Sequence, residues 1–174
     1  MHTLKATLID LIVLAVILLI ITILLPSGFI IEKTIEINAP PSKVFNLIYD
    51  LNQWSKWDPW VVETMDHHTG YQIEKSQSGY CLNWISYKGA VGRGKLTIIH
   101  SIPDSLIQTE IIFEKKIKCE GIFLISSHNN NTTIRLTIRG ELHGIKKWAN
   151  LLMEQQIGGQ FQQGFFKIKE ICEK

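Results

Sequence analysis

Residues 35–60 read IEINAPPSKVFNLIYDLNQWSKWDPW, and the hydrophobic period changes twice within this stretch. Before Pro40, apolar and polar side chains alternate with the period of a β-strand. After Pro41, apolar residues recur at helical spacing, and these are Val44, Phe45, Leu47, Ile48 and Leu51. Tryptophan then stands at every third position, at Trp54, Trp57 and Trp60, around a break at Pro59. The stretch therefore predicts a strand, a helix and a second short helical piece in direct succession.

The alternation extends upstream of this stretch as far as Phe29. One face of the predicted strand carries Ile31, Lys33, Ile35 and Ile37. The opposite face carries Glu32, Thr34 and Glu36. A strand with one mostly apolar face and one polar face covers a core on one side only.

Downstream, strand patterns follow one another with short turns between them. The segments read YQIEKS (71–76), YCLNWISYK (80–88), GRGKLTIIHSI (92–102) and TIRLTIRGEL (133–142). A further apolar run, LIQTEIIFEKKIKCEGIFLISS (106–127), is too long for one strand, and we divide it near Lys115. Strands joined by such short turns are antiparallel neighbours.

The period becomes helical again from His143 to Lys174, which predicts a long C-terminal helix. Gly158, Gly159 and Gly164 lie inside it, and each costs about 1 kcal/mol relative to alanine. We expect a break at Gly158–Gly159; the alternatives are a close approach to the sheet or room for a ligand. The order of elements predicts an α+β fold with the helices on one side of an antiparallel sheet.

This order, with three of its motifs, resembles the START-like helix-grip superfamily (SRPBCC), in its polyketide cyclase/dehydrase branch. The motifs are residues 35–60, GRGKLTIIHSIPDSLIQTEIIF (92–113) and IGGQFQQGFFKIKE (157–170). The resemblance spans about Ile31 to Glu173, and the Asn-rich SHNNNTT (127–133) replaces a usually Gly-rich hairpin tip. It implies a strongly bent sheet that grips the terminal helix, with an apolar cavity between them. In this superfamily the cavity usually holds a hydrophobic small molecule, and some members are enzymes.

The N-terminal segment Ala6–Leu25 is twenty residues long and almost entirely apolar. As a helix it spans about 30 Å, the thickness of a bilayer core. Its aliphatic side chains favour insertion by about 4–9 kcal/mol, whereas Asp10 opposes insertion by about 3 kcal/mol at most. A cleaved signal peptide is the alternative, but no A-x-A pattern precedes a cleavage point. We predict a single-pass membrane anchor in residues 1–28 and one domain in residues 29–174. Basic residues on the two sides leave the orientation open.

Composition excludes several classes of function. The net charge is +2 without a clustered basic face, so we expect no nucleic-acid partner. Cys81, Cys119 and Cys172 stand far apart, which indicates buried thiols rather than disulfides or a zinc site. Adjacent histidines in Asp66–His68 cannot face one ion from a regular strand. We expect neither a metal nor a cofactor.

Aromatic residues and one glycine are the candidates for lining a ligand pocket. They are Trp54, Trp57, Trp60, Trp84, Phe113, Trp148, Phe161, Gly164 and Phe165. An ordinary core is the alternative for each of them, since pockets are lined by core-type residues. Glu110 and His100 are acid–base candidates for facing such a cavity, but surface or structural roles are the simpler interpretation, and we assign no catalytic residue. Three functions stay open: a membrane-anchored binder of a hydrophobic small molecule or lipid, a cyclase- or dehydratase-like enzyme on a lipophilic substrate, and an interaction module with a filled core. We expect binding rather than catalysis.

Overall fold

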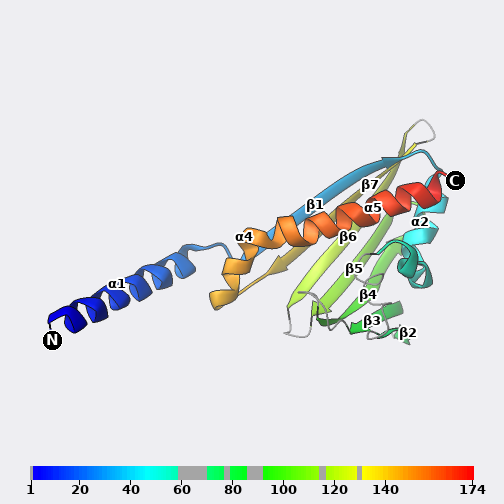
Figure 1. Ribbon diagram of the computed structural model, residues 1–174. Coiled ribbons are helices and arrows are strands. Elements are labelled where there is room, and N and C mark those ends of the chain that lie inside the picture. The colour runs from blue at the N-terminus through cyan, green and yellow to red at the C-terminus, as the bar shows by residue number, and fades with distance from the viewer. Residues whose placement is uncertain (1, 59–69, 77–78, 86–91, 114–116, 129–130) are drawn as a thin grey trace.

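The computed structural model describes residues 2–58, 70–76, 79–85, 92–113, 117–128 and 131–174. It is an α+β helix-grip fold, as the sequence predicts (Figure 1). The strands are β1 (Gly28–Ile37), β2 (Gly70–Ser76), β3 (Gly79–Ile85), β4 (Arg93–Ile102), β5 (Leu106–Phe113), β6 (Lys118–His128) and β7 (Asn131–Glu141). The helices are α1 (His2–Leu24), α2 (Pro41–Tyr49), η1 (Leu51–Lys56), η2 (Gly144–Ala149), α4 (Asn150–Met153), η3 (Glu154–Gly158) and α5 (Gly159–Cys172).

The seven strands form one antiparallel sheet in the order β1-β7-β6-β5-β4-β3-β2. Each strand from β2 to β6 pairs with the next strand along the chain, as expected for short connections. The division of the long apolar run near Lys115 is confirmed, because β5 ends at Phe113 and β6 begins at Lys118.

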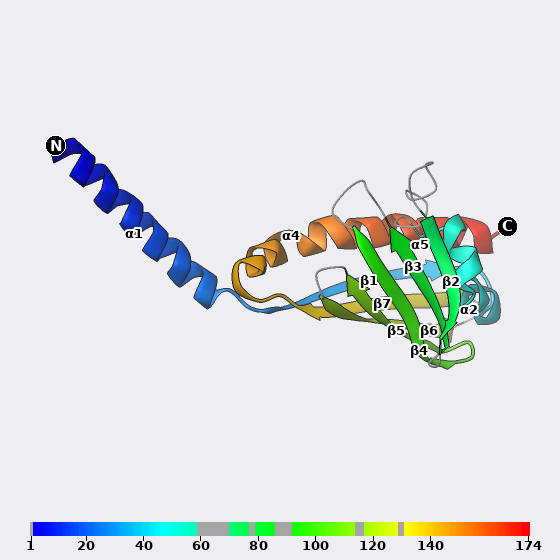
Figure 2. The same ribbon diagram turned by 90° about the horizontal axis from the view of Figure 1, so that it is seen from below.

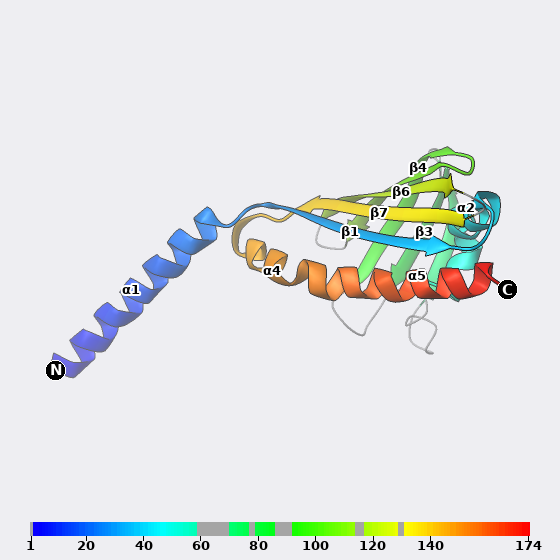
Figure 3. The ribbon, with the colours of Figure 1, turned by 90° about the horizontal axis from the view of Figure 1, so that it is seen from above.

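The two faces of the sheet differ sharply. Ile31 pairs with Ile138 and both are buried, whereas their neighbours Ile30 and Arg139 are exposed on the opposite side. We call these the inner and the outer face. Seen from above, α5 lies along the inner face, while α2 closes the end near the C-terminus (Figure 3). The hydrophobic core lies between the inner face and these helices.

Helix α2 buries the predicted stripe of Val44, Phe45, Leu47 and Ile48. The tryptophan spacing of three residues is explained by η1, a 3₁₀-helix, in which residues three apart share a face. Trp57 follows η1 directly, and its indole packs against that of Trp54. Pro59 and Trp60 lie outside the described residues.

The C-terminal helix does not break at Gly158–Gly159, so that expectation is wrong. Both glycines have right-handed helical dihedral angles, and the chain passes through a π-helical turn, η3, into α5. The reason is packing: Gly158 is buried against β1, and this contact holds the backbone in a helix despite the low propensity of glycine. Close approach to the sheet, one of the alternatives, is thus the role of Gly158.

Helix α1 is straight, apolar and separate from the core (Figure 2). None of the residues from Thr7 to Leu24 is buried by the rest of the chain. The helix ends just before Pro26, as predicted. Its length and composition fit one membrane crossing, and a signal sequence passes the same test.

Candidate ligand-binding site

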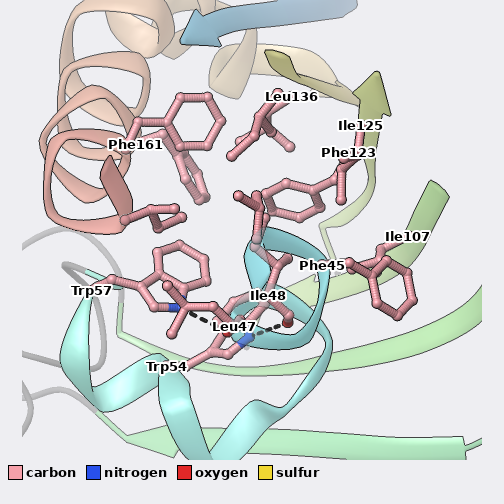
Figure 4. Close-up of a cluster of buried hydrophobic side chains, with 14 of the residues drawn as sticks. Phe45, Leu47, Ile48, Trp54, Trp57, Ile107, Phe123, Ile125, Leu136 and Phe161 are labelled. Carbon is pink, nitrogen blue, oxygen red and sulfur yellow. Dashed lines mark hydrogen bonds between the residues drawn. The ribbon is translucent and has the colours of Figure 1, made fainter. Parts of the chain in front are cut away.

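The centre of the inner face is an aromatic cluster built on the end of α2. The Trp54 indole Nε1 donates a 2.7 Å hydrogen bond to the carbonyl of Ile48, and Trp57 Nε1 donates a 3.3 Å bond to the carbonyl of Leu47 (Figure 4). Both acceptors belong to the last turn of α2, where carbonyls lack intrahelical partners. The two indoles lie 4.7 Å apart, and Trp54 meets the edge of Phe123 on β6. The cluster thus ties α2 and η1 to the sheet.

Helix α5 supplies the opposite wall of this cluster. Phe161 and Phe165 are buried, and Gly164 between them is buried as well. Figure 4 shows Phe161 facing Leu136 and Phe123 across the space between helix and sheet. The structure therefore brings together five of the candidates, namely Trp54, Trp57, Phe161, Gly164 and Phe165.

A second aromatic pair lies across strands β3 to β5. Phe113 pairs with Gly94, and Gly94 pairs with Trp84, so the three residues form one row on the inner face. A Cβ on Gly94 would stand 2.6 Å from Cη2 of Trp84, so only glycine lets the indole cross the strand. The indole meets Phe113 edge-on, with ring centroids 5.8 Å apart. Trp84 is buried, whereas Phe113 is half-buried.

Half-buried apolar side chains mark one end of the inner face. Phe29, Phe113, Ile117, Met153 and Ile157 pack against the core without being fully covered. Phe29 is the second residue of β1, and the register places Phe113 and Ile117 at that same end of the sheet. Met153 and Ile157 belong to the part of the terminal helix that crosses β1 there. We call these five residues the apolar rim; it lies at the end of the domain next to α1.

Trp148 is not brought to this site. Its half-buried indole donates a 2.8 Å hydrogen bond from Nε1 to Oγ1 of Thr22 in α1. It is therefore a contact between the terminal segment and the N-terminal helix. Trp60, the remaining candidate, lies outside the described residues.

Two charged features were missed in the candidate set. Lys33 lies on the inner face of β1 and pairs with Glu154 of η3, directly over Gly158. The alternation places this lysine on the same face as Ile31 and Ile35. An ionisable side chain in an apolar row indicates a buried ion pair or a site, and this indication was available in the sequence. The other feature is Asp58, which is 1% exposed and follows Trp57 directly. In the sequence, the burial of Asp58 is indicated only by its position among tryptophans.

The acid–base candidates do not face the inner cluster. Glu110 lies on the outer face opposite Glu120, with its carboxylate 3.9 Å from Nζ of Lys118, and His100 is exposed. Burial raises the pKa of the Cys119 thiol to about 11, so this residue is a neutral, apolar group at physiological pH. All three cysteines are buried and free, as expected.

Within the described ranges, no group of three or more His, Cys, Asp or Glu residues could hold a metal ion. Asp66–His68 lie outside those ranges.

Among the described residues, two of the grooves that open to solvent are notable for their size. The larger, of about 1170 Å³, lies at the α1 end of the sheet and is lined on the outer face by Ile30, Glu110, Glu120 and Arg139. The smaller, of about 370 Å³, lies between α2 and the end of α5. Neither includes Phe161 or Phe165 in its lining, so both lie apart from the aromatic cluster.

Comparison with known proteins agrees with this architecture. The family described as polyketide cyclase/dehydrase and lipid transport matches residues 29–173. The chain belongs to this family. The resemblance inferred from residues 35–60 and the two later motifs is therefore confirmed. No curated protein matches the chain in sequence.

Solved structures share the helix-grip fold of this family at low identity. The di-domain aromatase/cyclase StfQ of steffimycin biosynthesis matches with a TM-score of 0.67 and 10% identity over 84% of this chain and 51% of its own. A point mutant of norcoclaurine synthase from Thalictrum flavum matches with a TM-score of 0.64 and 9% identity, over 84% of this chain and 95% of its own. The Aha1 dimer of Colwellia psychrerythraea matches with a TM-score of 0.58 and 17% identity, over 83% and 96%. At these identities the likeness concerns the fold alone.

Proposed function

We propose that this family member is a membrane-anchored protein that binds a hydrophobic small molecule or lipid between the inner face and the terminal helix. The observation that carries the proposal is the apolar rim, where the core side chains are only half-covered at the end of the domain next to α1. Apolar surface that the protein leaves half-covered is stabilised when an apolar ligand covers it. The family description, which includes lipid transport, supports the same class of ligand.

The anchor is the second part of the proposal. Helix α1 exposes its whole apolar surface, and three residues separate its end at Leu24 from the start of β1 at Gly28. Inserted in a bilayer, α1 holds the apolar rim close to the membrane. A lipophilic ligand has a very low concentration in water, so this position brings the site to the phase in which the ligand resides.

Binding is tested with the full chain in phospholipid nanodiscs and an environment-sensitive fluorescent fatty acid. Gly164→Leu places a large side chain at a buried position of α5, the helix whose buried residues also include Phe161 and Phe165. Gly159→Leu is the matched control, because Gly159 is exposed and nothing lies within 4 Å of its Cβ position. We expect Gly164→Leu to lose probe binding with an unchanged melting temperature, whereas Gly159→Leu keeps binding.

The alternative of a filled core predicts the opposite pair of results. Overpacking a filled core costs about 1–3 kcal/mol, so Gly164→Leu would lower the melting temperature. Together with a wild-type protein that binds no apolar probe, that result overturns the binding proposal in favour of an interaction module.

The anchor is tested separately by washing membranes with alkaline carbonate. The full chain should stay in the membrane pellet and retain its N-terminus. A soluble mature form that begins near Ser27 would show instead that α1 is a cleaved signal.

One observation favours an enzyme as the second candidate function. Asp58 is a buried carboxyl group beside the aromatic cluster, and desolvated carboxyl groups are frequent general acids. If the protein is a dehydratase, mass spectrometry should find a product lighter by one water when co-purified ligand is incubated with the wild type. Asp58→Asn should then abolish this loss of water and still bind the ligand. An unchanged ligand mass with the wild type supports binding alone.

A further inference from the structure

The segment that leads into the terminal helix is held against the end of α1. Trp148 Nε1 donates to Oγ1 of Thr22, and Lys147 Nζ donates to the carbonyl of Ile23 at 3.2 Å. Asn150 Nδ2 donates to the carbonyls of Pro26 at 2.9 Å and Ser27 at 3.2 Å. Figures 1 and 3 both place α4 beside the end of α1. This segment, Gly144–Met153, comprises η2 and α4, and we call it the η2–α4 segment.

These hydrogen bonds determine the depth of the segment relative to α1. The apolar window of α1 runs to Leu24, so Thr22 belongs to its last turn. If α1 crosses a bilayer, its last turn lies at the boundary between hydrocarbon and headgroups. The indole of Trp148 then lies at that boundary, where tryptophan is enriched in membrane proteins.

The η2–α4 segment exposes large apolar side chains that the domain does not cover. Ile145 is 80% exposed, Leu151 is 64% exposed and Leu152 is 49% exposed. On a surface in water these side chains are unfavourable, and in the acyl region of a bilayer they are stabilised. The segment also contains Lys146 and Lys147 and no acidic residue, a combination that attracts anionic headgroups.

We propose that the η2–α4 segment is a second membrane contact, which lies in the interface of the bilayer that α1 crosses. The occupant of this surface is the lipid headgroup–acyl boundary, because the segment donates two hydrogen bonds to the last turn of α1, a helix of membrane-spanning length. Two more hydrogen bonds go to Pro26 and Ser27, just after that helix. The inference rests on the proposed anchoring by α1.

The contact has a consequence for ligand access. Met153 ends the η2–α4 segment, and Phe29 follows Pro26 and Ser27, to which Asn150 is bonded. Both Met153 and Phe29 belong to the apolar rim. When the η2–α4 segment contacts the bilayer interface, the apolar rim faces the lipid. A ligand can then pass from the bilayer to the site without crossing bulk water.

The test uses the full chain in vesicles of phosphatidylcholine and phosphatidylglycerol, with single nitroxide labels on introduced cysteines. The native cysteines are buried, so labelled wild type serves as the blank. The labels replace Ile145 and Leu151 in the segment, Leu14 in the middle of α1, and Ser126, an exposed residue of β6, as the control in water. Collision with oxygen, which concentrates in lipid, is compared with collision with a water-soluble nickel chelate.

We expect labels at positions 145, 151 and 14 to collide more often with oxygen than with the chelate, and the label at 126 to show the reverse. If the label at 14 is in lipid but the labels at 145 and 151 are accessible to the chelate, the η2–α4 segment does not contact the membrane. The proposed anchoring by α1 is unaffected by that result. A label at 14 that is accessible to the chelate overturns both the anchoring by α1 and the membrane contact of the η2–α4 segment. If the labels at 145 and 151 are shielded from both reagents, the η2–α4 segment contacts a protein partner and not the membrane. Spin–spin broadening in that case identifies a second copy of the chain.

Discussion

Gly158 lies directly beneath the side chain of Lys33: a Cβ at position 158 would stand 2.9 Å from Cε of Lys33 and 3.0 Å from Oε1 of Glu154. The missing side chain lets the lysine cross the terminal helix and pair with Glu154 on the preceding turn. This contact joins β1 to η3 beside the apolar rim. The glycine is thus required by the packing, although it weakens the helix locally.

Replacing each glycine of the pair by alanine should give different results. Gly159→Ala should raise the free energy of unfolding by about 0.5–1 kcal/mol, because alanine favours the helix and its Cβ meets no atom. Gly158→Ala should gain less or lose stability, because its Cβ displaces Lys33 from Glu154. Urea denaturation of both variants measures the difference.

Lys33→Ala is the control for this explanation. In that background Lys33 no longer crowds the Cβ, and the exposed Glu154 side chain, released from its partner, can move aside. Gly158→Ala should then become about as stabilising as Gly159→Ala. If Gly158→Ala remains worse in the absence of Lys33, the π-helical turn itself and not the lysine requires glycine.

Gly94→Ala should destabilise the sheet, because the new Cβ overlaps the Trp84 indole. We expect a loss of about 1–3 kcal/mol, typical of overpacking, with altered tryptophan fluorescence. Combining Gly94→Ala with Trp84→Leu should cost less than the sum of the two single substitutions. Additive losses in this double-mutant cycle would show that the indole does not depend on Gly94.

Trp54→Phe should cost more stability than Trp57→Phe. Both changes remove an indole N–H donor from a carbonyl in the last turn of α2, but the bond of Trp54 is 2.7 Å long and that of Trp57 is 3.3 Å. Loss of a partner to a buried polar group costs about 1–3 kcal/mol, and we expect Trp54→Phe within this range. Thermal melting measures the order; equal losses would assign the effect to ring volume alone.

Asp50 should make stability depend on pH in the acidic range. A hydrogen bond from the side chain of Asn52, with further bonds from the Asn52 amide and Gln53, lowers the pKa of Asp50 in the folded protein. A lowered folded pKa gives a stabilisation that is complete above the unfolded pKa of about 3.9 and is lost as the pH falls through the folded value.

Asp50→Ala also removes the N-cap of η1, so we expect a loss of about 1 kcal/mol at pH 7 that shrinks below about pH 4. Urea denaturation across pH tests it, and a constant difference down to pH 2 would contradict the assignment.

Much of the fold was predictable because it depends on local periods. The alternation of Ile31, Ile35 and Ile37 determines the inner face of β1, and the stripe around Val44 and Phe45 determines the buried side of α2. The apolar run Ala6–Leu25 likewise predicts where α1 ends, at Leu24, although the helix begins four residues earlier, at His2. These properties arise from residues a few positions apart, so the sequence alone carries them.

Tertiary structure decided what depends on pairs far apart along the chain. Trp148 is an aromatic residue of the kind that lines ligand pockets, yet its indole donates a hydrogen bond to Thr22, 126 positions away. The helix continues through Gly158 because Lys33 and Glu154, 121 positions apart, meet above it. No local period encodes such contacts, since they form only when the sheet, the terminal helix and α1 are brought together. The strand and helix patterns therefore follow from the sequence by itself, whereas the residues that each aromatic side chain contacts are determined by the tertiary structure.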